Sequence, residues 1–123
     1  MPGVLIIDDS PTDRLIMRGL LEDLGIEDIA EAADIASAKT LIAGFTKPPR
    51  VIVCDHRLPD GDGLDFLATL AASVRLLISG AALPQGSILP PGMEFREKPV
   101  DYDGCGDLAR LVMQWAVAGK VVA

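Results

Sequence analysis

The sequence predicts an α/β protein with a doubly wound, five-stranded parallel sheet. Short, continuous apolar runs alternate with amphipathic segments along the chain, and most of the runs end at a polar residue. Such runs are typical of parallel strands that helices cover on both faces. The 123 residues are enough for one core, so we expect a single domain over residues 1–123.

The apolar runs define the strands. The second run, centred on Ile29, is weaker than the others. The predicted strands cover residues 4–7, 26–33, 51–54, 74–79 and 93–99. They alternate with helical segments, which is the pattern of strand–helix–strand units and therefore of a parallel sheet.

Amphipathic segments predict the helices. The first has signals at both ends: Ser10 is a favourable N-cap, Pro11 fits the first helical position and Gly25 favours a stop. Each helix carries an apolar stripe that we expect to face the core. The helices and their stripes are 11–24 (Met17, Leu20, Leu21, Leu24), 34–45 (Ile35, Ala38, Leu41, Ile42), 63–72 (Leu64, Leu67 and Leu70 or Ala71) and 106–119 (Leu108, Leu111, Val112, Trp115).

The link between the fourth and fifth strands departs from this pattern. A helix should cross back here, but residues 81–92 read AALPQGSILPPG. Pro90 and Pro91 cannot extend a helix, and Gly86 weakens what remains. We therefore expect the fourth helix to be short or missing. For the sheet we expect the flavodoxin-like strand order 2-1-3-4-5, the commonest right-handed arrangement of five such strands.

Charge and cysteine content argue against several classes of protein. The net charge of −7 disfavours nucleic acid as a partner, because phosphate backbones need a basic face. Cys54 and Cys105 have the spacing of neither a metal site nor a disulfide framework, and Cys54 fits a buried structural thiol. The apolar run at residues 4–7 is too short for a signal peptide or a membrane span. We expect a cytoplasmic protein without a membrane partner.

Polar residues follow four of the predicted strands, at the edge where parallel strands end and ligands bind. They are Asp8 and Asp9 after the first strand, Asp55 after the third, Ser79 at the end of the fourth and Lys98 near the end of the fifth. Carboxylates about 5 Å apart repel by roughly 3 kcal/mol per pair, so three together require a cation. Mg²⁺ prefers oxygen ligands and keeps positions open for water or phosphate.

The same residues suit phosphoryl transfer, which depends on positioning and charge neutralisation. Lys98 supplies a compact positive charge for a phosphoryl oxygen, and the Ser79 hydroxyl can donate a hydrogen bond to it. An aspartate can act as the nucleophile and form an acyl phosphate. Asp55 is the best candidate because it stands alone at its strand end, whereas Asp8 and Asp9 form a pair.

This set of residues resembles the receiver domain of response regulators in two-component signalling. The resemblance covers nearly the whole chain, and its positions occur in the family's order. They are Asp8-Asp9 after VLII, Asp55 with Leu58-Pro59 and Gly63 in CDHRLPDGDG, Ser79 in LLISG, and Lys98-Pro99 in FREKP. Because no output domain fits within 123 residues, we interpret the chain as a receiver of the stand-alone, single-domain type.

The resemblance implies a phosphoryl-accepting switch and not an enzyme that turns over a substrate. Asp55 would take a phosphoryl group from the phosphohistidine of a sensor histidine kinase or of a histidine phosphotransfer protein, as in a phosphorelay. The domain would assist only its own phosphorylation and dephosphorylation. The signal would pass to a downstream protein target, or the phosphoryl group would be transferred to another protein. The protein could also form a homodimer, which the sequence does not decide.

The resemblance also implies a role for each site residue. Asp9 and Asp55 would bind Mg²⁺ directly, Asp8 would act mainly through water, and the backbone carbonyl of Arg57 would complete the metal site. Three further residues, which follow the metal ligands in the sequence, would act on the phosphoryl group or respond to it. Ser79 would follow the group on activation, Lys98 would pair with it, and Phe95 would be the aromatic switch whose rotamer is coupled to the hydroxyl.

Each of these residues also has a plainer interpretation. Asp8 and Asp9 would be favourable beside the positive end of the first helix without any metal. Ser79 could be a turn residue, Lys98 a solvated surface lysine, and Phe95 an ordinary core residue. For Asp8, Asp9, Ser79 and Lys98 these interpretations weaken when all the positions are considered together, because a chance coincidence of this order and spacing is improbable. For Phe95 the two interpretations stay more evenly balanced, since core packing alone would justify an aromatic residue there.

Two neighbours of Asp55 invite further hypotheses. His56 is the only histidine, and a side chain directed to the opposite face of the strand end is a plainer interpretation than a catalytic one. Arg57 occupies a position that, by analogy with the family, influences how water reaches the phosphoryl group. We therefore hypothesise an altered phosphate lifetime, which equal decay rates for Arg57→Ala and the wild type would refute.

Two rival functions are considered. A phosphatase that forms an aspartyl phosphate needs two acids separated by one residue after the first strand, whereas Asp8 and Asp9 are adjacent, and no cap domain is present. A protein-interaction module that works without phosphorylation would have lost site residues, and here they are all present. The altered segment at 81–92 nevertheless suggests that signalling uses a remodelled surface.

Overall fold

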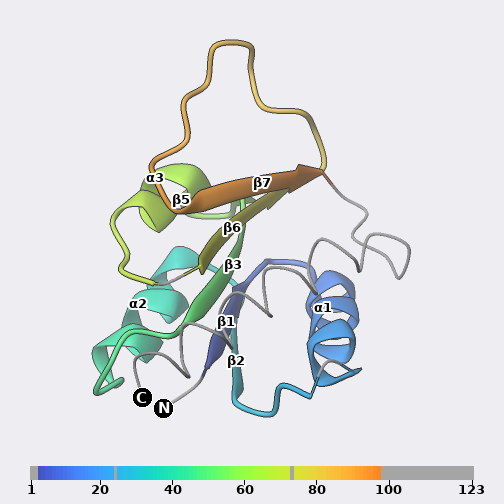
Figure 1. Cartoon of the computed structure of the whole chain (residues 1–123), viewed down its shortest axis with the longest axis vertical. Coiled ribbons are helices and arrows are strands. Elements are labelled where there is room, and N and C mark those ends of the chain that lie inside the picture. Colours follow the sequence, from blue (N-terminus) through green and yellow to red (C-terminus); the bar gives the residue numbers. More distant parts are fainter. Residues whose placement is uncertain (1–2, 24, 73, 98–123) are drawn as a thin grey trace.

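The computed structural model of this chain describes residues 3–23, 25–72 and 74–97. Five strands form a parallel sheet (Figure 1). Their spatial order is β2 (Ile29–Ala32), β1 (Val4–Ile7), β3 (Val51–Asp55), β6 (Val74–Ser79) and β7 (Met93–Glu97). Because β4 (Arg57–Leu58) and β5 (Gly61–Asp62) form a separate antiparallel hairpin, this is the predicted 2-1-3-4-5 order. The predicted fold class is confirmed.

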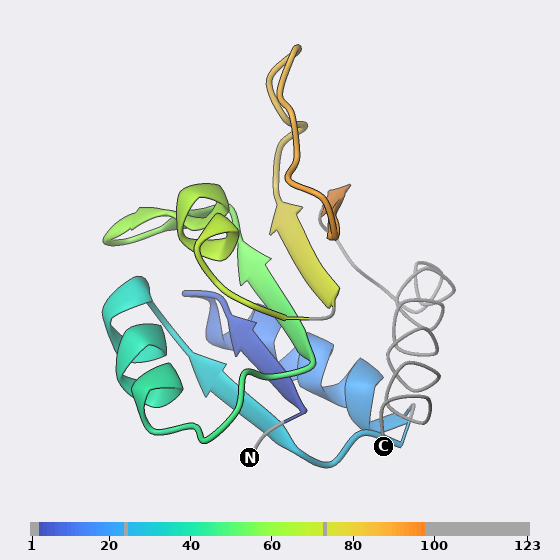
Figure 2. The same ribbon diagram turned by 60° about the vertical axis from the view of Figure 1, so that its left-hand side comes forward.

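Helices cover both faces of the sheet. The helix α1 (Pro11–Asp23) lies on one face, and α2 (Ile35–Ala43) and α3 (Gly63–Ala68) lie on the other, as Figures 1 and 2 show from two directions. The chain thus winds in both directions from β1. This arrangement buries β1 completely, since all four of its residues are inaccessible to solvent.

Two apolar clusters result, because successive residues of a strand point to opposite faces. The cluster beneath α1 contains Val4, Ile6, Met17, Leu20, Leu21, Val51, Val53, Val74, Leu76 and Ile78. The cluster beneath α2 and α3 contains Leu5, Ile7, Ala32, Ala38, Ile52, Cys54, Leu58, Phe66, Leu67, Leu77 and Met93. Each large aliphatic side chain buried in this way contributes about 2 kcal/mol of hydrophobic stabilisation. The clusters hold the strand ends, and hence the side chains that follow them, in a rigid frame.

The ends of α1 follow the sequence signals. The Ser10 Oγ accepts a hydrogen bond of 3.2 Å from the Asp13 amide, and Pro11 is the first helical residue. Gly25 has a φ of +89°, and its amide donates to the Glu22 carbonyl at 2.9 Å. This left-handed conformation ends the helix and favours glycine. The predicted stripe is buried at Met17, Leu20 and Leu21, and Leu24 lies outside the described residues.

Some predicted boundaries were wrong. The helix α3 ends at Ala68 and not at residue 72, because the Thr69 hydroxyl donates to the Phe66 carbonyl at 2.6 Å and so competes with a further helical turn. Leu70 is therefore half-buried outside the helix, and Ala71 is exposed. The strand β3 extends one residue further than predicted and includes Asp55.

The link between β6 and β7 contains no helix in residues 80–92, as predicted. It forms bends and turns, with positive φ at Gly86 and Gly92, and projects from the sheet in Figure 2. The predicted last helix, together with Lys98 and Cys105, lies outside the described residues.

Candidate functional site

Three carboxylates meet at the carboxyl edge of the sheet. One oxygen from each of Asp8, Asp9 and Asp55 lies within 4.8 Å of the others. The strands β1 and β3 are adjacent and parallel with Ile7 opposite Cys54, so the next residues, Asp8 and Asp55, fall at the same level. Asp8 and Asp55 are only 1% and 7% exposed, whereas Asp9 is open to solvent. The structure therefore brings these three predicted residues together.

This arrangement is electrostatically unfavourable without a cation. Carboxylates at such separations repel by roughly 3 kcal/mol per pair at an effective dielectric of about 20, and burial increases the penalty. The neighbouring thiol responds to the same environment: burial above all, and then the charges of Asp55 and Asp8, raise the pKa of Cys54 to about 12. A set of carboxylate oxygens that is open to water on one side fits the coordination that Mg²⁺ prefers.

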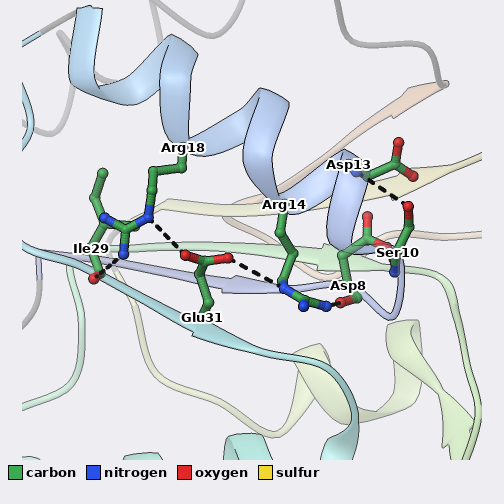
Figure 3. Close-up of polar contacts among 7 residues, drawn as sticks. All are labelled: Asp8, Ser10, Asp13, Arg14, Arg18, Ile29 and Glu31. Atoms are coloured by element: carbon green, nitrogen blue, oxygen red, sulfur yellow. Dashed lines mark hydrogen bonds and ion pairs between the residues drawn. The ribbon is translucent and has the colours of Figure 1, made fainter.

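The backbone around Asp8 is held at several points. Its amide donates to the Ala32 carbonyl on β2 at 3.0 Å. Its side-chain Oδ1 accepts a hydrogen bond of 2.9 Å from the Ser10 amide. Its carbonyl accepts a hydrogen bond of 2.6 Å from Arg14 Nη1 (Figure 3). These bonds restrict both the turn after β1 and the direction of the carboxylate.

The loop after Asp55 folds back over the strand end. The Gly63 amide donates to the His56 carbonyl at 2.6 Å, and a Cβ atom on Gly63 would lie 1.8 Å from the Asp55 carbonyl oxygen. Any side chain larger than hydrogen would therefore force the backbone apart. This contact gives a physical reason for the glycine that the sequence places eight residues after Asp55.

Asp60 ties the same loop to α2. Its two carboxylate oxygens accept hydrogen bonds from the Ile35 amide at 2.9 Å and the Ala36 amide at 3.0 Å. The hydrogen bond from Ile35 is the largest of the effects that lower the pKa of Asp60. Asp34 caps the same helix through the Ser37 amide, so the positive end of α2 receives two acids. Sequence reasoning missed Asp60, because its partners are distant along the chain and no local pattern indicates them.

The remaining predicted residues are placed as follows. Ser79 ends β6, is 4% exposed and accepts a hydrogen bond from the Ala81 amide at 3.2 Å through its hydroxyl. Phe95 lies in β7 opposite Leu77 and is half-buried against the α2–α3 cluster. Arg57 has an exposed side chain in β4. Lys98 is outside the described residues, and the roles assigned to these positions stay predictions.

The His56 side chain makes a specific contact with Asp62. Its Nε2 lies 3.4 Å from Asp62 Oδ2, and Asp62 also caps α3 by accepting a hydrogen bond from the Asp65 amide. The histidine is 17% exposed at its side chain. It therefore braces the small hairpin that follows Asp55.

Comparison with known proteins identifies the family. Residues 4–80 match the model of the response regulator receiver domain. Since this region is more than half of the chain, the protein belongs to the receiver domain family of two-component response regulators. Members of this family are signalling switches that in general bind Mg²⁺ at an acidic pocket. The matched region ends at Gly80, where the altered link between β6 and β7 begins.

Two curated relatives have similar sequences. The chemotaxis protein CheY of Pseudomonas aeruginosa is 36% identical over 73 residues, which are 59% of this chain and 57% of CheY. The KDP operon transcriptional regulatory protein KdpE of Escherichia coli is 36% identical over 70 residues, 57% of this chain and 30% of KdpE. The chain thus spans less than two thirds of either relative.

Solved receiver domains share the fold. The receiver domain of the hybrid histidine kinase CckA has a TM-score of 0.72 and 26% identity, and the match covers 91% of this chain and 96% of that one. A CheY-like receiver domain protein from Methanospirillum hungatei has a TM-score of 0.75 at 20% identity, and the match covers 100% and 99%; at this identity it shows the fold alone. Within the described residues, no helix has the length and apolar character needed to cross a bilayer.

Proposed function

We propose that this receiver domain is a phosphoryl-accepting switch in which Asp55 takes a phosphoryl group from a phosphohistidine. The donor is a sensor histidine kinase or a histidine phosphotransfer protein, and the site of action is the cytoplasm. The observation that carries the proposal is the convergence of Asp8, Asp9 and Asp55 within 4.8 Å of one another. Such a set of acids supplies a nucleophile and the ligands for a divalent cation at one place.

The chemistry is an in-line displacement at phosphorus. A carboxylate oxygen of Asp55 attacks the phosphorus, the phosphorus–nitrogen bond of the phosphohistidine breaks, and the released imidazole nitrogen takes a proton from solvent. The product is an acyl phosphate. When bound, Mg²⁺ neutralises the charge that gathers on the phosphoryl oxygens. Asp9, Asp55 and the Arg57 carbonyl would hold the ion, and Asp8 would contact it through water.

Three residues complete the proposed switch. The Ser79 hydroxyl stands at the end of the strand next to Asp55, since Ile78 lies opposite Asp55 in the sheet, and it would donate to a phosphoryl oxygen after modification. Lys98 would pair with another oxygen. Phe95, already half-buried beside β6, would change rotamer as Ser79 moves, and this change would be passed to a downstream protein target.

Direct phosphorylation tests the proposal. The protein is incubated with a small phosphodonor and Mg²⁺, and its intact mass is measured. We expect one added phosphoryl group in the wild type, and none in Asp55→Asn or in the presence of a chelator. Asp65→Asn, which removes an exposed acid from the first turn of α3, is the matched control and should be modified normally.

Two results would contradict this function. If the wild type gains no group, the domain works as a protein-interaction module without phosphorylation. If Asp55→Asn still gains the group, the acceptor is another residue. Continued turnover of a phosphomonoester beyond one equivalent would instead support the phosphatase alternative.

A further inference from the structure

We propose that Arg14 is a positioning residue for the Mg²⁺ site: it holds the backbone of Asp8 at the end of β1, and Glu31 on β2 holds Arg14 in turn. This inference rests on the proposed function, because it assigns a role toward the same metal. It concerns residues that none of the sequence patterns indicated. Figure 3 shows the network that links β2, α1 and the turn after β1.

Asp8 directly follows the last residue of β1, where the regular pairing with both neighbouring strands ends. Ile7 is the last residue of β1 and pairs with Ala32 and Cys54. The Asp8 amide still donates to the Ala32 carbonyl, but the chain then turns toward α1. The Asp8 carbonyl accepts its hydrogen bond from Arg14 Nη1 at 2.6 Å, a charge-assisted bond of the stronger kind. Arg14 thereby continues the restraint that the sheet provides up to Ile7.

Arg14 is itself fixed by an acid from the neighbouring strand. Its Nε lies 3.3 Å from Glu31 Oε1. The other oxygen of Glu31 accepts a hydrogen bond of 2.7 Å from Arg18 Nε, and Arg18 also donates to the Ile29 carbonyl at 3.1 Å. Glu31 is thus held between two arginines one turn apart on α1. The Arg14 side chain is 19% exposed, so solvent screens this pair less than a fully exposed one.

The restraint matters because the three carboxylates repel one another before the metal binds. The Ser10 amide orients the Asp8 carboxylate, but that bond directs it toward Asp55 only if the backbone of the turn stays in place. A guanidinium on the Asp8 carbonyl provides this restraint. It lowers the free energy of reorganisation that Mg²⁺ binding would otherwise require, as outer groups do at other metal sites.

The sign of the effect separates positioning from simple electrostatics. Arg14 carries a positive charge close to a cation site, so its removal alone would strengthen Mg²⁺ binding. Loss of positioning weakens it. Arg18 is the matched control, because it has the same charge, lies on the same helix and contacts the same Glu31, yet bonds to the Ile29 carbonyl and not to Asp8.

The experiment measures Mg²⁺ affinity of the unphosphorylated full chain by isothermal titration calorimetry, with thermal melting as a check on folding. We expect Arg14→Gln to raise the Kd about tenfold and Arg18→Gln to change it less than about twofold. The wild type and Arg14→Gln are compared at several ionic strengths, and the weaker binding should persist. An unchanged or lower Kd in Arg14→Gln, or an equal loss in Arg18→Gln, overturns the inference.

A second variant keeps the test decisive if Arg14→Gln does not fold. Arg14→Lys preserves the charge but cannot bond to the Asp8 carbonyl and to Glu31 through separate nitrogens. We expect a smaller rise in Kd, about threefold, and an unchanged Kd overturns the inference. Failure here is distinct from failure of the proposed function, which would appear as a wild type that gains no phosphoryl group on Asp55. A wild type that binds no Mg²⁺ refutes both.

Discussion

Two connections leave the carboxyl edge of the sheet beside Asp55, and they are held in opposite ways. Residues 56–62 connect β3 to α3, and residues 80–92 connect β6 to β7. We call them the acceptor loop and the projecting segment. The acceptor loop is bonded along its length, whereas the projecting segment is bonded mainly near its two ends.

The acceptor loop has a contact at nearly every position. It pairs with itself in the β4–β5 hairpin, and Asp60 bonds to two amides of α2. The His56–Asp62 pair braces the hairpin. At its end, Gly63 packs directly on the Asp55 carbonyl. These contacts restrain the backbone that directly follows Asp55.

The projecting segment is held by hydrogen bonds near its first and last residues. The Ala81 amide bonds to Ser79 Oγ at 3.2 Å, and Arg75 Nη2 donates to the Pro91 carbonyl at 2.6 Å. Between these points Ile88 is 87% exposed. A groove of about 650 Å³ separates the two connections, lined by Leu58 and Leu64 on one side and by Leu83, Pro84 and Ser87 on the other.

One edge of this sheet therefore places a tightly bonded loop beside the metal-binding and phosphoryl-accepting residues, next to a segment that has few bonds to hold its conformation. Metal binding and phosphoryl transfer require side chains whose positions vary by no more than a fraction of an ångström, and a densely bonded loop restricts them in this way. A segment with few bonds opens locally at low free energy. Because the projecting segment begins at Ser79, we expect it to respond when that residue moves.

Glycine substitutions should show the largest contrast between the two connections. In Gly63→Ala the added methyl meets the Asp55 carbonyl at 1.8 Å, so we expect a loss of about 3 kcal/mol or more in the free energy of unfolding. In Gly80→Ala nothing lies within 4 Å of the new Cβ, and the change should stay within about 0.5 kcal/mol. Urea denaturation measures both free energies of unfolding, and similar values would show that the two connections do not differ in how tightly they are packed.

Phosphorylation should change the projecting segment selectively. We expect amide hydrogen exchange to change more in residues 80–92 than in residues 56–62 when the small phosphodonor and Mg²⁺ are added, as read by mass spectrometry. Arg75→Met provides a second test, because it removes the hydrogen bond to the Pro91 carbonyl. We expect faster amide exchange near Pro91 and a loss of about 1.5 kcal/mol in the free energy of unfolding. Unchanged exchange in residues 80–92 would refute a role for this segment.

Arg96→Met is the control for the Arg75 variant. Arg96 pairs with Glu94 on its own strand, so its removal should leave exchange near Pro91 as it is in the wild type. An equal change in both variants would mean that loss of any arginine near β7 has this effect.

Asp60→Asn should have the smallest effect, and one that depends on pH. The hydrogen bonds from α2 lower the pKa of Asp60 in the folded protein below its usual value of 3.8. The ionised carboxylate therefore contributes stability fully above the unfolded-state pKa and loses it as the pH falls through the folded-state pKa. The wild type should exceed Asp60→Asn in stability near pH 7 and lose this advantage below pH 3.8. A difference that does not change with pH, in urea melts at each pH, would contradict this.

The predicted elements were most accurate where their signals are local. The Ser10 cap, the Gly25 stop and the buried stripe of α1 depend on residues within a few positions of one another. The prediction of a short or missing fourth helix followed from Pro90, Pro91 and Gly86, which act locally. The end of α3 was predicted wrongly, because a local bond from Thr69 outweighed an apolar pattern that continued to Leu70.

For the candidate site, the sequence indicated which side chains follow the strands, and the parallel sheet brought Asp8, Asp9 and Asp55 together. It did not indicate what holds them. Asp60, which accepts hydrogen bonds from two amides of α2, and Arg14, which lies between Asp8 and Glu31, join segments that are separate in the chain. Their roles, like those of Ser79, Phe95, Arg57 and Lys98, stay predictions that the experiments above address.

The alternation of strands and helices and the acids at the sheet edge could be predicted from the amino-acid sequence, because apolar periods and caps act over one or two turns of chain. The strand order was also predicted, but from the commonest right-handed arrangement of five such strands and not from a local signal. The groups that hold those acids in position became evident only from the tertiary structure. Hydrogen bonds such as those of Asp60 and Arg14 form between surfaces that meet after the sheet has assembled, so no local pattern encodes them.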